Sequence, residues 1–318
     1  MLKPSTTFFR HEPKRSQLVN ELWKAQKRDR YITEQTMGEL AKSLDISLIE
    51  IQGIVSFYHF FHTQPTAKHV IYLNNSLISK TKGYDRIREA LERETGTRFN
   101  TTDRTETFAL FETPCIGLSD QEPAALIDFY PFTNLNVMKV REVITALKAG
   151  KKAADICDQP ADHIRYLPPN NHTIFFRPYT AGEGLSKAVA IKPEEVIQIV
   201  KTSELSGRGG AFFPTWIKWE GCRKETTTPK YVVCNADEGE PGTFKDRVLL
   251  NKEPGSVLEG MIIAGYAIGA AYGIIYLRAE YKWLLKKLEG TIQQFYDRGL
   301  LGRSIKGMDG FDFDIRIQ

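Results

Sequence analysis

Two neighbouring segments of the chain contain residues of the kinds that bind phosphate groups and flat ring systems. The first segment, residues 206–219, combines three glycines with two cationic side chains, Arg208 and Lys218. Glycine lets backbone N–H groups approach a ligand closely, and the two cations attract a phosphate or an electron-rich ring. The three glycines are Gly207, Gly209 and Gly210. By itself such a loop is weak evidence, because most glycine-rich loops are ordinary turns.

The second segment, residues 231–247, is more specific. A short apolar strand, Tyr231–Cys234, runs directly into a tight turn that is rich in hydrogen-bond acceptors and also contains glycine and proline. Acceptors at the carboxyl end of a strand, beside a glycine loop, suit the hydroxyl groups of a ribityl or ribose chain. These acceptors are Asn235, Asp237, Glu238 and Glu240.

The elements that position these segments begin with a helical region, predicted for residues 1–66. Apolar residues at helical spacing predict helices over Ser16–Arg28 and Thr33–Leu44. The sequence Ser47-Leu-Ile-Glu50 is a capping box that opens a third helix. We expect the apolar face of this helix to include Ile51, Val55, Tyr58 and Phe61.

From residue 67 to residue 150 the apolar period changes to that of strands alternating with helices. This order predicts an α/β layer of thioredoxin-like type on top of the small helical bundle. The predicted strands are His69–Leu73, Thr105–Phe111 and Ala124–Phe129, and the predicted helices are Tyr84–Thr95 and Val137–Ala149, which end at Gly96 and Gly150.

Residues 151–184 are rich in proline and lack a sustained period, so we interpret them as a linker. Residues 185–318 again alternate helices with strands, which indicates a largely parallel, Rossmann-like sheet. A final strand without a following helix leaves the sheet half built, so we expect this domain to be incomplete and the chain to be the amino-terminal part of a longer polypeptide. The predicted helices here begin at Pro193, Gly255 and Tyr281, and the predicted strands are Tyr231–Cys234, Gly273–Leu277 and Phe311–Gln318.

Composition and charge exclude several classes of protein. With 318 residues, two or three domains are expected, and a net charge of +4 spread along the chain argues against nucleic-acid binding. The most apolar stretch, Val257–Tyr276, is interrupted by Glu259 and by four glycines, so we interpret it as a buried helix that runs into a strand and not as a membrane span. The four cysteines are scattered, which favours a reducing cytoplasm over a disulfide framework.

The two segments closely resemble the flavin- and nicotinamide-binding core of the NADH-oxidising subunit of respiratory complex I and of its relatives in NAD-reducing hydrogenases. This resemblance implies FMN and NAD as cofactors. NADH contacts would include the ring of Phe213 and the carboxylate of Glu240, and Lys218 would stabilise negative charge on the reduced flavin. The FMN contacts would fall on Gly207, Arg208, Gly209, Gly210, Lys218, Asn235, Asp237 and Glu238.

The first 150 residues resemble the small thioredoxin-like 2Fe–2S subunit of complex I, notably at Val55–Tyr58 and at Thr113–Pro123. The fusion of both parts in one chain is similar to the diaphorase α subunits of cytoplasmic NAD-reducing nickel–iron hydrogenases. The resemblance implies hydride exchange between NAD(H) and FMN, with electrons passing through iron–sulfur centres to a hydrogenase (H2 + NAD+ = NADH + H+). It implies an iron–sulfur diaphorase small subunit and nickel–iron hydrogenase subunits as partners in a hetero-oligomer.

Three departures from the family pattern limit this assignment. The four cysteine positions of the 2Fe–2S cluster are occupied by Asn74, Ser79, Cys115 and Ser119, so we expect no 2Fe–2S cluster in this domain. The glycine loop carries Phe212 and Trp216, which pack outward on a shared helical face or fill the flavin cavity. The cysteines of the family's 4Fe–4S cluster would lie after residue 318.

Two alternatives to the diaphorase reading stay open at this point. The same site would serve the NADH-binding flavoprotein subunit of a formate dehydrogenase or complex I-type assembly. A non-catalytic structural paralogue would have its flavin cavity filled by Phe212 and Trp216.

Overall fold

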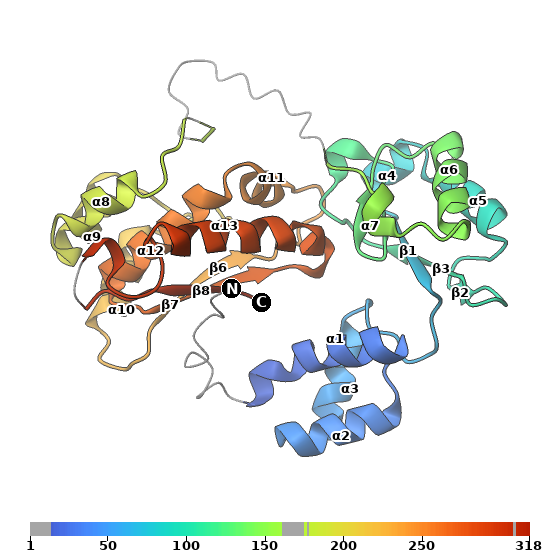
Figure 1. Ribbon diagram of the computed structural model, residues 1–318, viewed down its shortest axis with the longest axis horizontal. Coiled ribbons are helices and arrows are strands. Elements are labelled where there is room, and N and C mark those ends of the chain that lie inside the picture. Colours follow the sequence, from blue (N-terminus) through green and yellow to red (C-terminus); the bar gives the residue numbers. More distant parts are fainter. Residues whose placement is uncertain (1–13, 161–174, 177, 308–309) are drawn as a thin grey trace. The chain divides into compact units, whose positions relative to one another are not determined.

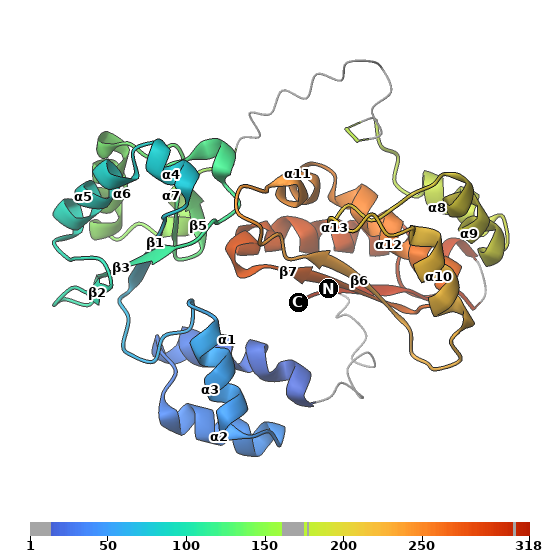
Figure 2. The same cartoon turned by 180° about the vertical axis from the view of Figure 1, so that it is seen from behind.

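The computed structural model describes residues 14–160, 175–176, 178–307 and 310–318, which form two units (Figures 1 and 2). The first unit contains the residues up to 114 together with residues 123–128 and 134–157. The second contains residues 115–122, residues 129–133 and the part of the chain from residue 158 onward. The domain boundaries expected at residues 66, 150 and 184 stay predictions.

Three helices open the first unit, as their apolar spacing predicts. Leu22, Ile32 and Ile51 are fully buried in their shared core. Ser47 caps the third helix, because its hydroxyl accepts a hydrogen bond from the backbone N–H of Glu50 at 3.2 Å. The helices are α1 (Leu18–Asp29), α2 (Glu34–Leu44) and α3 (Leu48–Phe57), preceded by the short η2 (Lys14–Gln17).

The expectation that Tyr58 and Phe61 continue the apolar face of α3 is wrong. The helix ends at Phe57, and Tyr58 has an extended backbone, with φ −87° and ψ 106°. Phe61 reaches the helical core from the turn that follows, whereas Tyr58 is 39% exposed.

The sheet of the thioredoxin-like part has the strand order β2-β3-β1-β4-β5. β1 is parallel to β3 and antiparallel to β4, and β2 is antiparallel to β3. The strands are β1 (His69–Asn74), β2 (Thr101–Thr102), β3 (Phe108–Thr113), β4 (Ala125–Ile127) and β5 (Tyr130–Phe132). The helices are α4 (Leu77–Thr81), α5 (Tyr84–Thr95), α6 (Val137–Lys148) and α7 (Ala153–Ile156), with the short η3 (Ser119–Gln121).

Two of the strands predicted for this sheet differ from the observed ones for local reasons. The strand expected from Thr105 starts at Phe108, because the Asp103 carboxylate accepts hydrogen bonds from the N–H groups of Thr107 and Phe108 and holds a turn there. The strand expected over Ala124–Phe129 is shorter and ends at Ile127 as β4, since Asp128 and Phe129 both adopt positive φ, and β5 begins only after them at Tyr130.

A three-stranded parallel sheet, β6-β7-β8, lies at the centre of the second unit, as the alternating pattern predicts. α12 and α13 pack on one face of it, where Val232, Ile275 and Ile315 contribute to a common apolar core (Figure 1). The strands are β6 (Tyr231–Ala236), β7 (Tyr272–Leu277) and β8 (Asp314–Ile317). The helices are α8 (Glu183–Val189), α9 (Pro193–Thr202), α10 (Thr215–Lys224), α11 (Lys245–Lys252), α12 (Pro254–Ile268) and α13 (Leu285–Asp297), with the short η4 (Ala279–Leu284) and η5 (Ile305–Gly307).

The length and apolarity of the helices show whether any of them could span a membrane. Among the helices in the described residues, none is both long and apolar enough to cross a lipid bilayer. α12, which covers most of the apolar stretch singled out above, has 15 residues and ends at Gly269 in the left-handed conformation. Of the predicted linker, residues 161–174 and 177 lie outside the described residues, and α7 occupies part of the remainder.

Candidate functional site

The glycine loop is closed at its base by backbone contacts and opens toward solvent at its tip. The N–H of Gly207 donates to the carbonyl of Phe213 at 2.9 Å, and the N–H of Thr215 donates to the carbonyl of Leu205 at 2.9 Å. Gly210 has φ +111°, which a residue with a side chain rarely adopts. Arg208 is exposed at the tip of this loop.

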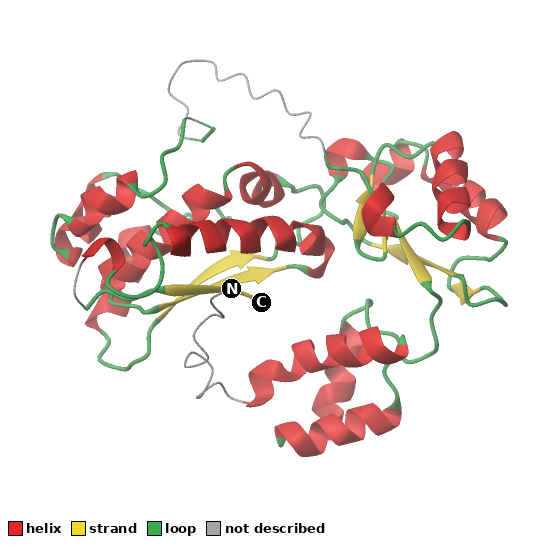
Figure 3. Cartoon of the chain, viewed as in Figure 1, coloured by secondary structure: helices red, strands yellow, loops and turns green. Residues whose placement is uncertain are grey.

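The acidic turn leaves the carboxyl end of β6 and leads into α11, a loop between a strand and a helix in Figure 3. The Asn235 side-chain oxygen accepts the N–H of Asp237 at 3.1 Å and tightens the turn. The carbonyl of Glu240 accepts the hydroxyl of Thr243 at 2.7 Å. The carboxylates of Asp237 and Glu240 are on exposed residues and form no hydrogen bond or ion pair with the described part of the chain.

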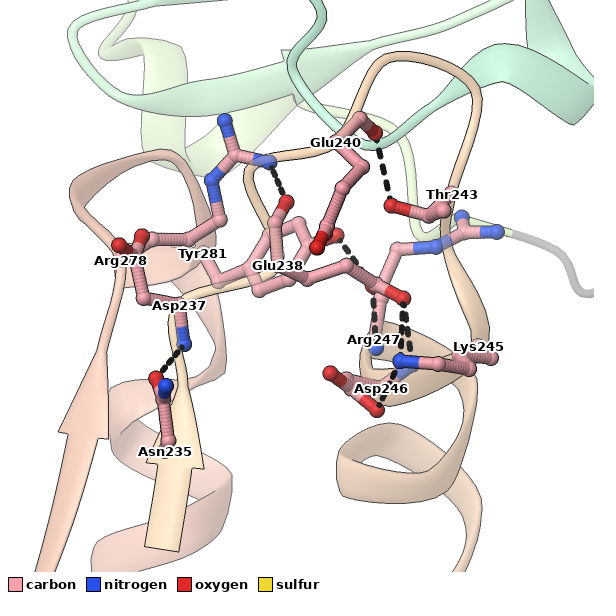
Figure 4. A network of polar contacts seen from close by, with 10 residues as sticks. All are labelled: Asn235, Asp237, Glu238, Glu240, Thr243, Lys245, Asp246, Arg247, Arg278 and Tyr281. Atoms are coloured by element: carbon pink, nitrogen blue, oxygen red, sulfur yellow. Dashed lines mark hydrogen bonds and ion pairs between the residues drawn. The ribbon is translucent and has the colours of Figure 1, made fainter. Parts of the chain in front are cut away.

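Glu238 differs from its neighbours because its carboxylate is 1% exposed and already engaged. One oxygen accepts the N–H of Asp246 at 3.0 Å, and the other accepts the N–H of Arg247 at 3.3 Å and the hydroxyl of Tyr281 at 2.9 Å. These two N–H groups belong to the first turn of α11, so Glu238 caps that helix and neutralises its positive end (Figure 4).

Two further side chains support Glu238 from behind. The Arg278 guanidinium donates to the carbonyl of Glu238 and to the carboxylate of Glu280. Burial, and then the nearby Glu238 carboxylate, raise the pKa of Tyr281 above its ordinary value, so its hydroxyl stays protonated as a donor.

A cavity of about 990 Å³ lies between the glycine loop, the acidic turn and α11, within the second unit. Six of the ten residues predicted to bind cofactor line it together, although they come from two separate segments. They are Arg208, Gly209, Asn235, Asp237, Glu238 and Glu240.

The other four predicted residues do not line this cavity. Gly207 closes the base of the loop through its N–H, and Gly210 follows Gly209 in the loop with nothing within 4 Å of its Cβ position. The Lys218 ammonium lies over the ring of Phe213, 5.5 Å from its centroid, and both residues are exposed. This cation–π contact gives Lys218 a partner within its own loop.

Phe212 and Trp216 also lie outside the cavity lining. Trp216, in α10, packs on the apolar cluster that contains Val196 and Ala267, and the Lys201 ammonium lies 4.3 Å from its ring centroid. Phe212 is 62% exposed and has φ +51°, before α10 begins. The two rings therefore do not share a helical face, contrary to expectation, because α10 starts only at Thr215.

Sequence reasoning missed the second wall of the cavity. Side chains of α11 and the residue before it contribute an apolar surface with two lysines at its rim. A signal was present, since Phe244, Val248 and Leu249 follow helical spacing, but Phe175 and Phe176 carried none. The missed lining residues are Phe175, Phe176, Thr243, Phe244, Lys245, Asp246, Val248, Leu249 and Lys252.

Two titratable groups beside the cavity are shifted by burial. Burial, with the charges of Glu238 and Glu240, raises the pKa of Asp246, against the opposing hydrogen bond from Lys245. Burial also raises the pKa of Cys234 to about 11, so this thiol in β6 is protonated at neutral pH and is not a nucleophile.

The four positions that correspond to the family's cluster cysteines differ in their contacts. In the first unit, Asn74 is fully buried and accepts the N–H of Ser76 at 2.9 Å, and Ser79 is fully buried in α4, where its hydroxyl has no hydrogen-bond partner among the described residues. In the second unit, the thiol of Cys115 lies 3.4 Å from the hydroxyl of Ser119. Within the described residues, no group of three or more His, Cys, Asp or Glu side chains is arranged to hold a metal ion.

Comparison with known proteins matches each half of the chain to a family model. Residues 5–148 match the thioredoxin-like [2Fe-2S] ferredoxin family, and residues 200–318 match the Nuo51 FMN-binding domain. The first match is to a cluster-binding family, although three of the four ligand positions lack cysteine here.

Individual relatives extend this picture. The chain is 48% identical to the α subunit of the NAD-reducing hydrogenase HoxS of Cupriavidus necator, over 99% of this chain and 54% of that subunit. It is 51% identical to the NADP-reducing hydrogenase subunit HndC of Solidesulfovibrio fructosivorans, over 43% of this chain and 27% of that subunit.

A solved structure agrees with these sequence matches. A crystal structure of an NAD+-reducing [NiFe]-hydrogenase in the H2-reduced state matches with a TM-score of 0.83 and 30% identity, over 96% of this chain and 52% of that one. The chain thus spans about half the length of the HoxS α subunit and of this structural match.

Proposed function

Because the chain is a homologue of the α subunit of NAD-reducing hydrogenases, with a thioredoxin-like part and an FMN-binding part, we propose that it passes electrons between NAD(H) and FMN. In the whole protein these electrons would continue through iron–sulfur centres to a hydrogenase partner. The observation that carries the proposal is the cavity that gathers Arg208 with the acidic turn of Asn235, Asp237 and Glu240.

The residues in the cavity fit FMN and a dinucleotide. The Asp237 and Glu240 carboxylates are exposed acceptors without partners among the described residues, which hydroxyl groups of a ribityl or ribose chain would satisfy. Arg208 supplies a positive charge for a phosphate, and the apolar side chains of α11 supply a wall for a flat ring.

When bound, FMN supplies the exchange between a two-electron hydride carrier and one-electron acceptors. The chain's own residues bind and orient: the acidic turn holds hydroxyl groups, and Glu238 holds that turn on α11. No side chain of the turn needs to act as a general acid or base, because hydride transfer depends on placing two rings at short range.

We further propose that the thioredoxin-like part holds no 2Fe–2S cluster. Only Cys115 can supply a thiolate at the four ligand positions, and Asn74, Ser79 and Ser119 are poor ligands for iron. A 4Fe–4S centre belongs, in this proposal, to the part of the whole protein that its relatives have beyond the matched region.

For partners and compartment, we propose an iron–sulfur diaphorase small subunit and nickel–iron hydrogenase subunits in a cytoplasmic hetero-oligomer. The names of the relatives support this choice, since two of them are hydrogenase subunits. Relatives that are NADH-quinone oxidoreductase F subunits match a smaller share of this chain than the HoxS α subunit does, at 43% identity over 47% of this chain for the protein from Rhizobium meliloti.

The test replaces Glu240 with Gln in the full-length protein. Losing one charge-assisted hydrogen bond is worth about 1.5–3 kcal/mol, so we expect NADH to bind about 10- to 150-fold more weakly, with little change in FMN content. NADH affinity is measured by titration and FMN content by absorbance. Glu225→Gln, on an exposed glutamate at the end of α10, is the matched control and should change neither. Loss of FMN with unchanged NADH binding would show that Glu240 has been assigned to the wrong ligand.

A further inference from the structure

A loop that corresponds to the cluster-ligand loop of the family packs tightly on the acidic turn. This loop, residues 115–122, is part of the second unit, and we call it the brace loop. Cys115, Gln121 and Glu122 are all buried in it. Its residues do no chemistry in the site described above, so their extensive contacts with the turn need another explanation.

The closest approach is at Gly117, which has φ +73°. A Cβ atom at this position would lie 2.1 Å from the hydroxyl oxygen of Tyr281, the residue whose hydroxyl donates to Glu238. The brace loop therefore touches the support of Glu238 so closely that only glycine fits there.

Two further contacts join the brace loop to the backbone of the acidic turn. The Arg278 guanidinium donates to the carbonyl of Cys115 at 2.9 Å and also to the carbonyl of Glu238. The N–H of Gly242, at the end of the turn, donates to the thiol sulfur of Cys115 at 3.5 Å. The turn is thus held at its middle and at its end.

An ion pair between Asp120 and Arg247 links the brace loop to α11. The Arg247 side chain is fully buried, and its guanidinium donates to Asp120 at 2.9 Å. Two other nitrogens of this guanidinium have no hydrogen-bond partner among the described residues, so Asp120 is the acidic side chain that compensates the buried charge. The backbone N–H of Arg247 donates to Glu238, so the ion pair fixes the same residue that holds the acidic turn.

We propose that Asp120 is a positioning residue of the FMN-binding cavity, which acts through Arg247 on Glu238 and so keeps the acidic turn in its binding conformation. This inference rests on the proposed function. It gives the brace loop a role, because the loop supports the flavin site of the same unit. Asp120 itself does not line the cavity, so its effect reaches the ligand only through the turn and α11.

The experiment measures the FMN dissociation constant by flavin fluorescence for the full-length protein and for Asp120→Asn. Removing the charge of one partner of a buried pair leaves the other uncompensated, so we expect the constant to rise about tenfold or more. The matched control is Asp128→Asn, which removes the charge from a second largely buried contact, 2.8 Å from His69 in the first unit, and should lower thermal stability without changing FMN affinity.

A second measurement separates positioning from loss of fold and does not need FMN. In Asp120→Asn, amide hydrogen exchange over residues 238–247 should be faster than in the parent protein. Exchange in the β6-β7-β8 sheet should stay as it is in the parent. If Asp120→Asn does not fold, the double variant Asp120→Asn with Arg247→Gln leaves no uncompensated buried charge but still lacks the ion pair, so it should bind FMN about tenfold or more weakly than the parent.

The outcomes distinguish the two proposals. A parent protein that binds no FMN overturns the proposed function and this inference with it. A parent that binds FMN, with Asp120→Asn binding within twofold or with unchanged amide exchange in the turn, overturns the brace alone, as does a folded double variant that binds FMN within twofold of the parent.

Discussion

Replacing Glu238 with Gln is the sharpest test of how the acidic turn is held. The side chain is isosteric, so the change removes charge and one acceptor without creating a cavity. Its carboxylate is 1% exposed and accepts from Asp246, Arg247 and Tyr281, whose donors converge from two sides. We expect Glu238→Gln to lower the free energy of unfolding by more than an isosteric substitution at an exposed position would.

The magnitude follows from the geometry. The same oxygen of Glu238 accepts from the Tyr281 hydroxyl and from the N–H of Arg247. If the NH2 group of Gln takes the place of this oxygen, the Tyr281 hydroxyl can rotate and accept from it. The N–H of Arg247 cannot accept, so it is left without a partner. An unpaired buried donor costs about 1–3 kcal/mol. Losing a negative charge at the N-terminus of α11 costs about 0.3–1 kcal/mol more. The total is about 1.3–4 kcal/mol, which at about 2–4 °C per kcal/mol lowers the unfolding temperature by about 3–16 °C.

The assay is thermal unfolding followed by tryptophan fluorescence in a Trp23→Phe background. The remaining tryptophans, Trp216, Trp219 and Trp283, all lie in the second unit and report its unfolding. Glu240→Gln is the matched control, two residues away in the same turn but with an exposed carboxylate, and should shift the transition by less than about 1 °C. If Glu238→Gln shifts it no more than this control, the carboxylate does not hold the turn and the reasoning fails.

Two further predictions concern the missing 2Fe–2S cluster of the thioredoxin-like part and a buried histidine of the first unit. When the 318-residue chain is reconstituted anaerobically with iron and sulfide and then reduced, we expect no EPR signal of a 2Fe–2S centre, because three of its four ligand positions lack cysteine; a stoichiometric signal would refute this. Burial, and then the neighbouring His59, lower the pKa of His62 from 6.5 to about 4, so the unfolded chain binds the proton first as the pH falls. The stability that neutral His62 contributes should be complete above pH 6.5 and be lost as the pH falls toward 4, and His62→Gln should flatten this dependence of the unfolding temperature; an equally steep dependence in the variant would contradict the assignment.

Much of the secondary structure follows from local sequence alone. α5 and α12 occur where periodicity and the closing glycines predict them, since a left-handed residue at Gly96 or Gly269 ends a helix whatever its tertiary surroundings. The misplaced elements have local causes that periodicity does not register. The carboxylate of Asp103 delays β3, and the positive φ values of Asp128 and Phe129 end β4 two residues before the expected end of its strand.

The sequence by itself determined which residue types are available for the candidate site: glycines with Arg208 in one segment, and Asn235, Asp237 and Glu240 after a strand in another. Their residue types and their position at the carboxyl end of β6 are local properties that can be read along the chain. The tertiary structure decided the rest, because contacts between distant segments are invisible to periodicity. It joined the two segments in one cavity with α11, and it buried Glu238 at the N-terminus of α11, where its two carboxylate oxygens accept backbone N–H groups and so hold the turn. A carboxylate in a sequence looks the same whether it faces a ligand or a backbone N–H group, and only burial and hydrogen-bond geometry distinguish Glu238 from Glu240.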